Sequence, residues 1–162
     1  TRFAISVLGT DSADTTQVRS TRDGPPVEFF RFSDHGACVA FLSRELKRLI
    51  AKEHLANIAL LTPDEGLADV YFDGLLSAEV PDVRRVRNQK FAFRAGIDVV
   101  PAGEIKGLEF DYVVIVEAAA RHYPDTAHHR RLLHVAGTRA VHQLWLTSVG
   151  TPSSILPKTT DD

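Results

Sequence analysis

Two short segments of the sequence combine charged, small and hydroxyl side chains in a way that suits a phosphate-bearing ligand. The first, residues 106–111, is Lys-Gly-Leu-Glu-Phe-Asp. Gly107 has no Cβ and lets the backbone approach a ligand closely, while Lys106 and Glu109 flank it with opposite charges. On these residues alone, an ordinary surface turn with a helix-capping carboxylate is the competing interpretation, because short motifs discriminate weakly.

The second segment, residues 130–140, carries an arginine beside small residues. Gly137 and Thr138 are poor helix formers at a point where a helix would otherwise continue. The guanidinium of Arg139 is a fixed, delocalised charge that can donate two parallel hydrogen bonds to phosphate oxygens. A solvated arginine on a helix surface is the alternative.

The elements that must position these segments follow from hydrophobic periodicity. Strands are predicted at 27–32, 57–61, 83–86, 97–100, 112–116 and 143–148, and helices at about 35–50, 65–76 and 125–141. Ser33-Asp34 and Pro63-Asp64 are expected to begin the first two helices. The run 112–116 has no polar alternation, which predicts a central strand of a parallel sheet. Residues 3–8 resemble the tail of a helix ended by Gly9, and 9–26 an irregular connection.

Alternating strands and helices predict an α/β fold in three layers, with a mostly parallel sheet and helices on both faces. The 162 residues suit one domain, 1–162, with 1–26 partly irregular. Residues 106–111 follow one strand and precede the next, and ligands in such sheets collect at the carboxyl ends of strands.

Composition excludes several classes of protein. No apolar run approaches the roughly 18–20 residues that span a bilayer, and the first residues do not form a signal peptide. The single cysteine, Cys38, cannot form an internal disulfide, so a reducing cytoplasm is expected and a small buried hydrophobe is the favoured role. The net charge of −2 gives no argument for nucleic acid. Because the sequence contains no Met, we expect an excised or processed piece.

Taken together, the two segments resemble the late motifs of superfamily 1 helicases of the UvrD/Rep type. In that family, Lys-Gly-Leu-Glu-Phe-Asp leads into an apolar strand, and Arg-Arg-Leu is followed by Val and Thr-Arg-Ala. Here residues 106–111 precede the run 112–116, and residues 130–132 precede Thr138-Arg139-Ala140. The likeness is specific at these motifs and loose over nearly all the rest of the chain.

This resemblance implies the second RecA-like motor domain of an ATP-dependent DNA helicase, with a P-loop NTPase fold that lacks its own P-loop. Arg139 would be the arginine finger, Glu109 would contact the ribose, and Lys106, Gly107 and Thr138 would line the same nucleotide surface. ATP with Mg²⁺ is the expected cofactor, with the Mg²⁺ ligands on a separate P-loop domain. No Gly-x-x-x-x-Gly-Lys-Ser/Thr occurs, so this piece alone is expected to be inactive, and single-stranded or duplex DNA is the expected partner.

The chain also departs from the family pattern. Pro101-Ala102-Gly103 replaces the Thr-x-His that usually contacts DNA, and His128-His129 replaces an acidic pair. The tail 150–157 is similar to a HelD-like branch that acts on RNA polymerase. An alternative hypothesis is therefore a helicase-like binding module on RNA polymerase or another protein. A third is an unrelated α/β nucleotide-binding fold.

Two further groups of side chains suggest binding sites. Five cations lie in one stretch with two phenylalanines between them: Arg84, Arg85, Arg87, Lys90 and Arg94, with Phe91 and Phe93. Such a stretch could follow a phosphate backbone with base stacking, or form a solvated edge above two buried rings. Three histidines, His122, His128 and His129, lack Cys or Glu partners at ligand spacing, which favours a surface role over a metal site.

Overall fold

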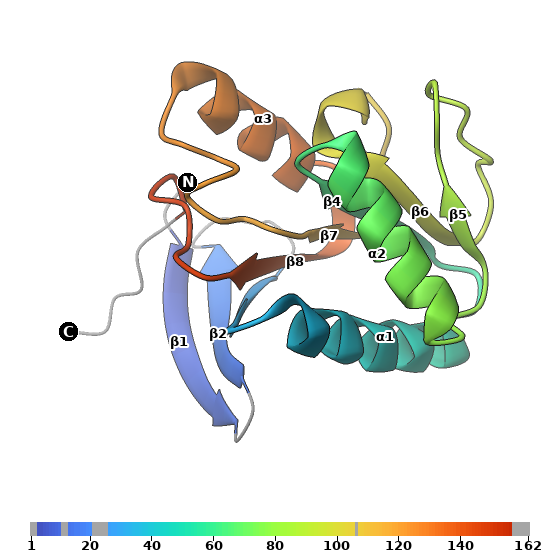
Figure 1. The fold of residues 1–162 in the computed structure, drawn as a ribbon, viewed down its shortest axis with the longest axis horizontal. Helices are drawn as coiled ribbons and strands as arrows, with labels where there is room; N and C mark the ends of the chain where they lie inside the picture. Colours follow the sequence, from blue (N-terminus) through green and yellow to red (C-terminus); the bar gives the residue numbers. More distant parts are fainter. Residues whose placement is uncertain (1–2, 11–12, 21–25, 106, 157–162) are drawn as a thin grey trace.

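The computed structural model describes residues 3–10, 13–20, 26–105 and 107–156. One sheet of eight strands, in the order β1-β2-β3-β8-β7-β4-β6-β5, runs through the molecule (Figure 1). The six strands from β3 to β5 are parallel, and β1 and β2 extend the sheet as an antiparallel hairpin. The predicted mostly parallel sheet is confirmed.

The bounds of the elements are as follows. The strands are β1 (Phe3–Thr10), β2 (Ala13–Ser20), β3 (Val27–Phe32), β4 (Asn57–Thr62), β5 (Val83–Arg85), β6 (Gly96–Pro101), β7 (Phe110–Ile115) and β8 (Ala140–Val149). The helices are α1 (His35–Lys52), α2 (Glu65–Ser77), the 3-10 turn η1 (Ala102–Glu104) and α3 (Ala127–Gly137).

Each α-helix begins at a side-chain cap that the sequence provides. The carboxylate of Asp34 accepts from Ala37 N at 2.7 Å, and that of Asp64 accepts from Leu67 N at 2.8 Å. The hydroxyl of Thr126 accepts from His129 N at 3.1 Å. These caps satisfy amide groups that have no partner within the helix, and they place all three helix starts at the carboxyl end of the sheet.

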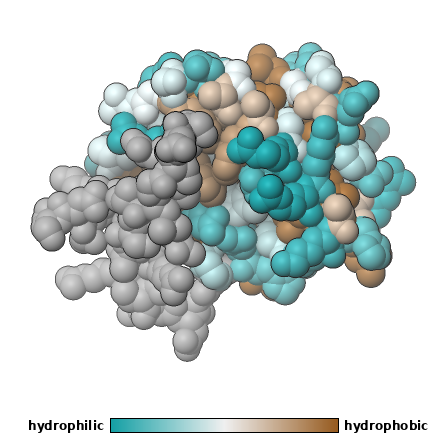
Figure 2. Space-filling model, turned by 90° about the horizontal axis from the view of Figure 1, so that it is seen from below, coloured by the Kyte–Doolittle hydropathy of each residue, from teal (hydrophilic) through white to brown (hydrophobic). Residues whose placement is uncertain are grey.

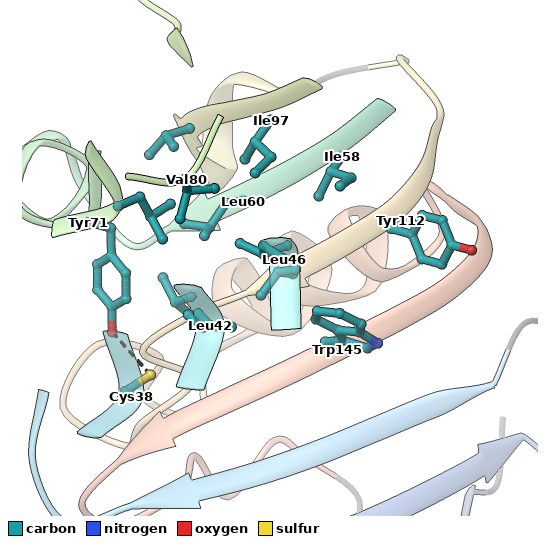
Figure 3. Close-up of a cluster of buried hydrophobic side chains, with 14 of the residues drawn as sticks. Cys38, Leu42, Leu46, Ile58, Leu60, Tyr71, Val80, Ile97, Tyr112 and Trp145 are labelled. Atoms are coloured by element: carbon teal, nitrogen blue, oxygen red, sulfur yellow. Dashed lines mark hydrogen bonds between the residues drawn. The ribbon is translucent and has the colours of Figure 1, made fainter. Parts of the chain in front are cut away.

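Two hydrophobic cores, one on each face of the sheet, hold the three layers together. On one face, α1 and α2 bury Leu42, Leu46 and Leu75 against Ile58 and Leu60 (Figure 3). On the other face, α3 buries Leu133 and Ala136 against β7 and β8. Both faces are therefore covered by helices, as the sequence predicted.

β7 lies between β8 and β4, in the interior of the sheet. Val113 and Val114 point to opposite faces and are both fully buried. This confirms the central position predicted from the unbroken apolar run. β5, at one edge of the sheet, is a three-residue strand that lies within the predicted strand 83–86.

The segments 3–10 and 13–20 were predicted incorrectly. Phe3–Thr10 is a strand rather than the tail of a helix, and it pairs along its whole length with Ala13–Ser20, where an irregular connection was expected. The apolar residues Phe3, Ile5 and Val7 alternate at a period of two, which suits a strand. The short run also ends at Gly9, and that ending resembles a helix C-cap.

The third helix is shorter than the predicted span of 125–141. α3 ends at Gly137, Thr138 forms its C-cap, and β8 begins at Ala140. The amide of Thr138 donates to His134 O and Val135 O, which closes the last turn. Arg139 thus lies in a tight turn between a helix and a strand instead of on a helix face.

The edge of the sheet at β5 is held by an ion pair that is largely buried. Arg84 Nε lies 2.8 Å from Asp98 Oδ1, and the side chains are 18% and 3% exposed. The same guanidinium donates to Ala95 O at 2.8 Å and to Arg94 O at 3.0 Å. Arg84 therefore fixes the end of the connection between β5 and β6 as well as the edge strand.

The described surface over α1 is mainly polar. Figure 2 shows this side, with hydrophilic residues predominating and hydrophobic ones scattered among them. Arg44, Lys47 and Arg48 of α1 are exposed. No helix among the described residues is long and apolar enough to cross a membrane.

Cys38 is expected to react with thiol reagents only when the chain unfolds. Its side chain is fully buried beneath Tyr71, whose hydroxyl lies 3.7 Å from Sγ (Figure 3). Burial raises the pKa of the Cys38 thiol to about 11, so roughly one thiol in a thousand is ionised at pH 8. Labelling with an aromatic disulfide across a urea series should follow the unfolding transition measured by circular dichroism.

A Leu55→Cys variant in a Cys38→Ala background provides the matched control, because Leu55 is 82% exposed. Its thiol should react fully without urea. Rapid labelling of Cys38 in the folded chain would contradict the buried placement.

Candidate functional site

The two motif segments meet at the amino ends of β7 and β8. The amide of Phe110 donates to the carbonyl of Arg139 at 2.8 Å, and Phe110 pairs with Ala140 in the sheet. Glu109 and Arg139 therefore occupy equivalent positions, each one residue before its strand. Because β6 and β7 are parallel, the segment between them starts at the carboxyl edge with η1 and ends at the amino edge with Glu109.

The motif residues of the first segment are open to the outside. Gly107 and Glu109 are exposed, and Leu108 packs partly against the core beneath α3. A Cβ built on Gly107 would meet no atom within 4 Å. Nothing in the described chain thus requires glycine there, and the space beside it is available to a partner. Lys106 lies outside the described residues.

Arg139 is partly buried, and its donors are largely uncommitted. Nε lies 3.3 Å from Val135 O, and Nη2 lies 3.3 Å from the hydroxyl oxygen of Thr138. The Thr138 hydroxyl itself donates to Val135 O at 2.7 Å. Among the described residues no carboxylate lies within salt-bridge distance of Arg139, so a guanidinium with full charge is held at this edge by neutral oxygens.

Asp111, the last residue of the first motif, forms a clamp between two strands. Its carboxylate accepts from Asn57 N at 3.0 Å, and the Asn57 side-chain oxygen accepts from Asp111 N at 2.8 Å. The clamp joins the starts of β4 and β7, while the bond from Phe110 to Arg139 joins those of β7 and β8. Sequence reasoning gave Asp111 no role, because Asn57 is 54 residues away.

A second polar cluster lies at the opposite, carboxyl edge of the sheet, around Glu117. This side chain is fully buried. It accepts from the hydroxyl of Tyr71 at 2.8 Å and contacts His35 Nε2 at 2.6 Å and Arg121 Nη2 at 3.3 Å. Burial raises the pKa of Tyr71, so its hydroxyl keeps the proton that it donates. Glu117 also has a left-handed backbone with φ of 57°, which costs a non-glycine residue about 1–3 kcal/mol.

The sequence did not single out Glu117. The one available signal was a charged residue inside the otherwise apolar run 112–120. Its partners come from α1, α2 and the turn that follows β7, and no spacing along the chain relates them. Pro101 and Ala102, which replace the hydroxyl expected in the family pattern, are buried at this same edge, and Gly103 is exposed.

The cations of β5 and of the connection to β6 divide into two groups. Three of them bind carboxylates. Arg84 binds Asp98, Arg85 binds Glu65 and Asp69, and Arg87 binds Asp69. Two others, Lys90 and Arg94, are exposed.

The two phenylalanines of this stretch differ as well. Phe91 packs against the core, whereas Phe93 is 76% exposed. Of the two alternatives given for this stretch, the one with two buried rings is therefore wrong for Phe93.

Comparison with known proteins finds similarity to helicase C-terminal domains. Residues 99–147 match the family model of the UvrD-like helicase C-terminal domain. The C-terminal domain of a possible DNA helicase from Lactobacillus plantarum WCFS1 is 26% identical, with a TM-score of 0.66 over 82% of this chain and 78% of that chain. The UvsW helicase from bacteriophage T4 is 8% identical, with a TM-score of 0.49 over 68% of this chain and 42% of that chain. No curated protein matches significantly.

The matched segment contains both motifs and the strand between them. The likeness to the Lactobacillus domain extends the agreement to most of the fold, because it covers 82% of this chain. Together, the motif order, the shared fold and the family match show that residues 99–147 are similar to the UvrD-like helicase C-terminal domain and that the fold resembles that of a helicase C-terminal domain.

Proposed function

We propose that this domain forms one wall of an ATP site shared with a separate P-loop domain of the same motor. The observation that supports this most directly is the bond from Phe110 N to Arg139 O. It brings the carboxylate of Glu109 and the guanidinium of Arg139 to one edge of the sheet, although 30 residues separate them along the chain. In the proposed site, Glu109 accepts from the ribose hydroxyls and Arg139 faces the γ-phosphate.

In this proposal Arg139 acts as the arginine finger. Negative charge spreads over the oxygens of the γ-phosphoryl group as it is transferred, and a guanidinium placed there stabilises that charge. Two features support the role. No carboxylate among the described residues neutralises Arg139, and Thr138 together with Val135 O holds its side chain against the end of α3. Thr138 would thus be a positioning residue.

The loop before Glu109 would couple the nucleotide to the rest of the motor. Gly107 leaves open space at the edge, so the companion domain or the phosphates can approach the backbone closely. Lys106 belongs to the same loop by sequence. Residues 101–109 run from the carboxyl to the amino edge of the sheet, so a change at the nucleotide reaches the opposite edge within nine residues. The resulting domain closure and opening would drive movement along DNA, single-stranded or duplex.

ATP and Mg²⁺ would be held mainly by the companion domain. A Mg²⁺ ion usually takes one or two protein carboxylates together with the phosphate oxygens, and in this proposal those carboxylates lie on the companion domain, because Glu109 is assigned to the ribose. The sequence contains no P-loop. This domain would therefore add charge stabilisation and ribose contacts to a nucleotide that is already bound.

The isolated chain is accordingly expected to show no ATP turnover above background. Mixing or fusing it with the P-loop domain of its motor should restore turnover, because both walls are then present. Release of inorganic phosphate, measured with and without a single-stranded oligonucleotide, is the test. Turnover by the isolated chain at the rate of the complete motor would refute the shared site.

A further inference from the structure

The pairing of β7 with β8 is irregular close to Arg139. Phe110 of β7 pairs with Ala140 of β8, and the next pair joins Tyr112 to Gln143. Between these two pairs β8 holds one residue more than β7, which makes a β-bulge. Bulges bend a strand and increase its twist, and they are common beside active sites, where they change the direction of a side chain.

The bulge consists of Val141 and His142, which together face Asp111 of β7. Both bulge residues are exposed, whereas the later part of β8 is buried. His142 Nε2 lies 3.6 Å from Asp111 Oδ1, and the centroid of the His142 ring lies 5.8 Å from that of Tyr112. Side chains of β7 thus hold the bulge in place at the edge of the sheet that carries Arg139.

The backbone is fixed on both sides of the extra residue. On one side, Asp111 is joined to Asn57 by two hydrogen bonds of 3.0 and 2.8 Å. On the other side, the carbonyl of Arg139 accepts from Phe110 N at 2.8 Å. A shift of one residue along a strand turns its side chains to the opposite face of the sheet. The direction in which the chain presents Arg139 therefore depends on the extra residue.

We propose that the bulge directs the Arg139 side chain toward the γ-phosphate, with Asp111 and His142 as positioning residues. This inference rests on the proposed function, in which Arg139 is the arginine finger. The Asp111 carboxylate contacts Asn57 and His142 and forms no salt bridge with Arg139. It can therefore hold the backbone of the edge in place without neutralising the guanidinium.

The test uses the complete motor that contains this domain. Deletion of Val141 removes the bulge and should lower the kcat for ATP by on the order of 100-fold, as expected when a catalytic group is displaced by about 1 Å. The KM for ATP should change much less, because the companion domain holds most of the nucleotide. His142→Ala keeps the chain length and should lower kcat by a smaller factor. His128→Ala is the matched control and should leave kcat unchanged, since His128 is an exposed histidine at the opposite end of α3.

A double-mutant cycle separates positioning of Arg139 from a general structural role. If the bulge acts through Arg139, deletion of Val141 in the Arg139→Ala background should cause no further loss of kcat. Circular dichroism and binding of ADP show whether the deletion variant folds. If it does not fold, the same cycle between His142→Ala and Arg139→Ala decides the question.

Two outcomes would overturn the proposal. One is an unchanged kcat in His142→Ala, and the other is a loss of kcat that persists in the Arg139→Ala background. Arg139→Ala alone separates these results from the shared ATP site. If that variant loses turnover while His142→Ala behaves as wild type, only the positioning role fails. If Arg139→Ala retains turnover, the proposed finger itself fails.

Discussion

Replacing Arg139 with alanine is expected to lower the kcat for ATP by roughly 10³–10⁵-fold in the complete motor, as for other arginine fingers. The KM for ATP should change much less, because the companion domain holds most of the nucleotide in the ground state. The physical reason is that Arg139 has no carboxylate partner among the described residues. Its charge is therefore available to the γ-phosphoryl group as negative charge develops there.

Arg139→Lys should recover only part of the lost rate, because an ammonium group cannot donate two parallel bonds to phosphate oxygens. Arg131→Ala is the matched control, since Arg131 is an exposed arginine on α3 in the same motif. It should retain kcat within about twofold. Single-turnover hydrolysis and nucleotide binding should be measured separately. Unchanged ATP turnover in Arg139→Ala would refute the role of Arg139 as an arginine finger. It would favour a binding module that does not depend on ATP hydrolysis.

The second large effect is expected at Asp98. Asp98→Ala removes the carboxylate that binds Arg84 at 2.8 Å and leaves a guanidinium that is mostly buried without its counter-charge. Breaking a buried ion pair in this way typically costs about 3–5 kcal/mol. The free energy of unfolding, measured by urea titration and circular dichroism, should fall by this amount. The end of the β5–β6 connection, which Arg84 also binds, should become accessible to proteases.

Two controls test the cause of that effect. Arg44→Ala removes a partner of the exposed pair with Glu45, whose N–O distance is 3.6 Å, and should change stability by less than about 1 kcal/mol. The double variant Arg84→Leu/Asp98→Leu removes both charges and should be more stable than Asp98→Ala. If the double variant is no more stable than the single one, an uncompensated charge is not the reason for the loss.

Most of the fold can be predicted from the sequence because local chemistry determines it. Asp34 and Asp64 begin their helices as expected, since a short carboxylate before an apolar periodic run satisfies the first amides. The run 112–116 gives the central strand, because a segment with no polar residue can only be buried on both faces. The helix caps and the central strand depend only on residues close to them in the sequence, so sequence patterns predict them.

The features that the sequence did not reveal depend on contacts between distant segments. Asp111 and Asn57 recognise each other across 54 residues, and Glu117 is stabilised by side chains from two helices and a turn. Phe3–Thr10 was mistaken for the tail of a helix because a short run of apolar and small side chains suits either structure, and Ala13–Ser20 was mistaken for an irregular connection. The predicted helix 125–141 included Arg139, although Gly137 and Thr138 are poor helix formers and α3 ends at Gly137.

The clamp between Asn57 and Asp111 and the hydrogen bond from the Phe110 amide to the Arg139 carbonyl also affect how far the sequence of this domain can diverge. Main-chain groups take part in all three hydrogen bonds, and the carbonyl that Arg139 contributes to the bond with Phe110 is common to every residue type. Substitutions elsewhere in the sheet can then accumulate without displacing the amino edge that carries Glu109 and Arg139. This is consistent with a family match confined to residues 99–147, while the architecture shared with the Lactobacillus domain extends over 82% of the chain.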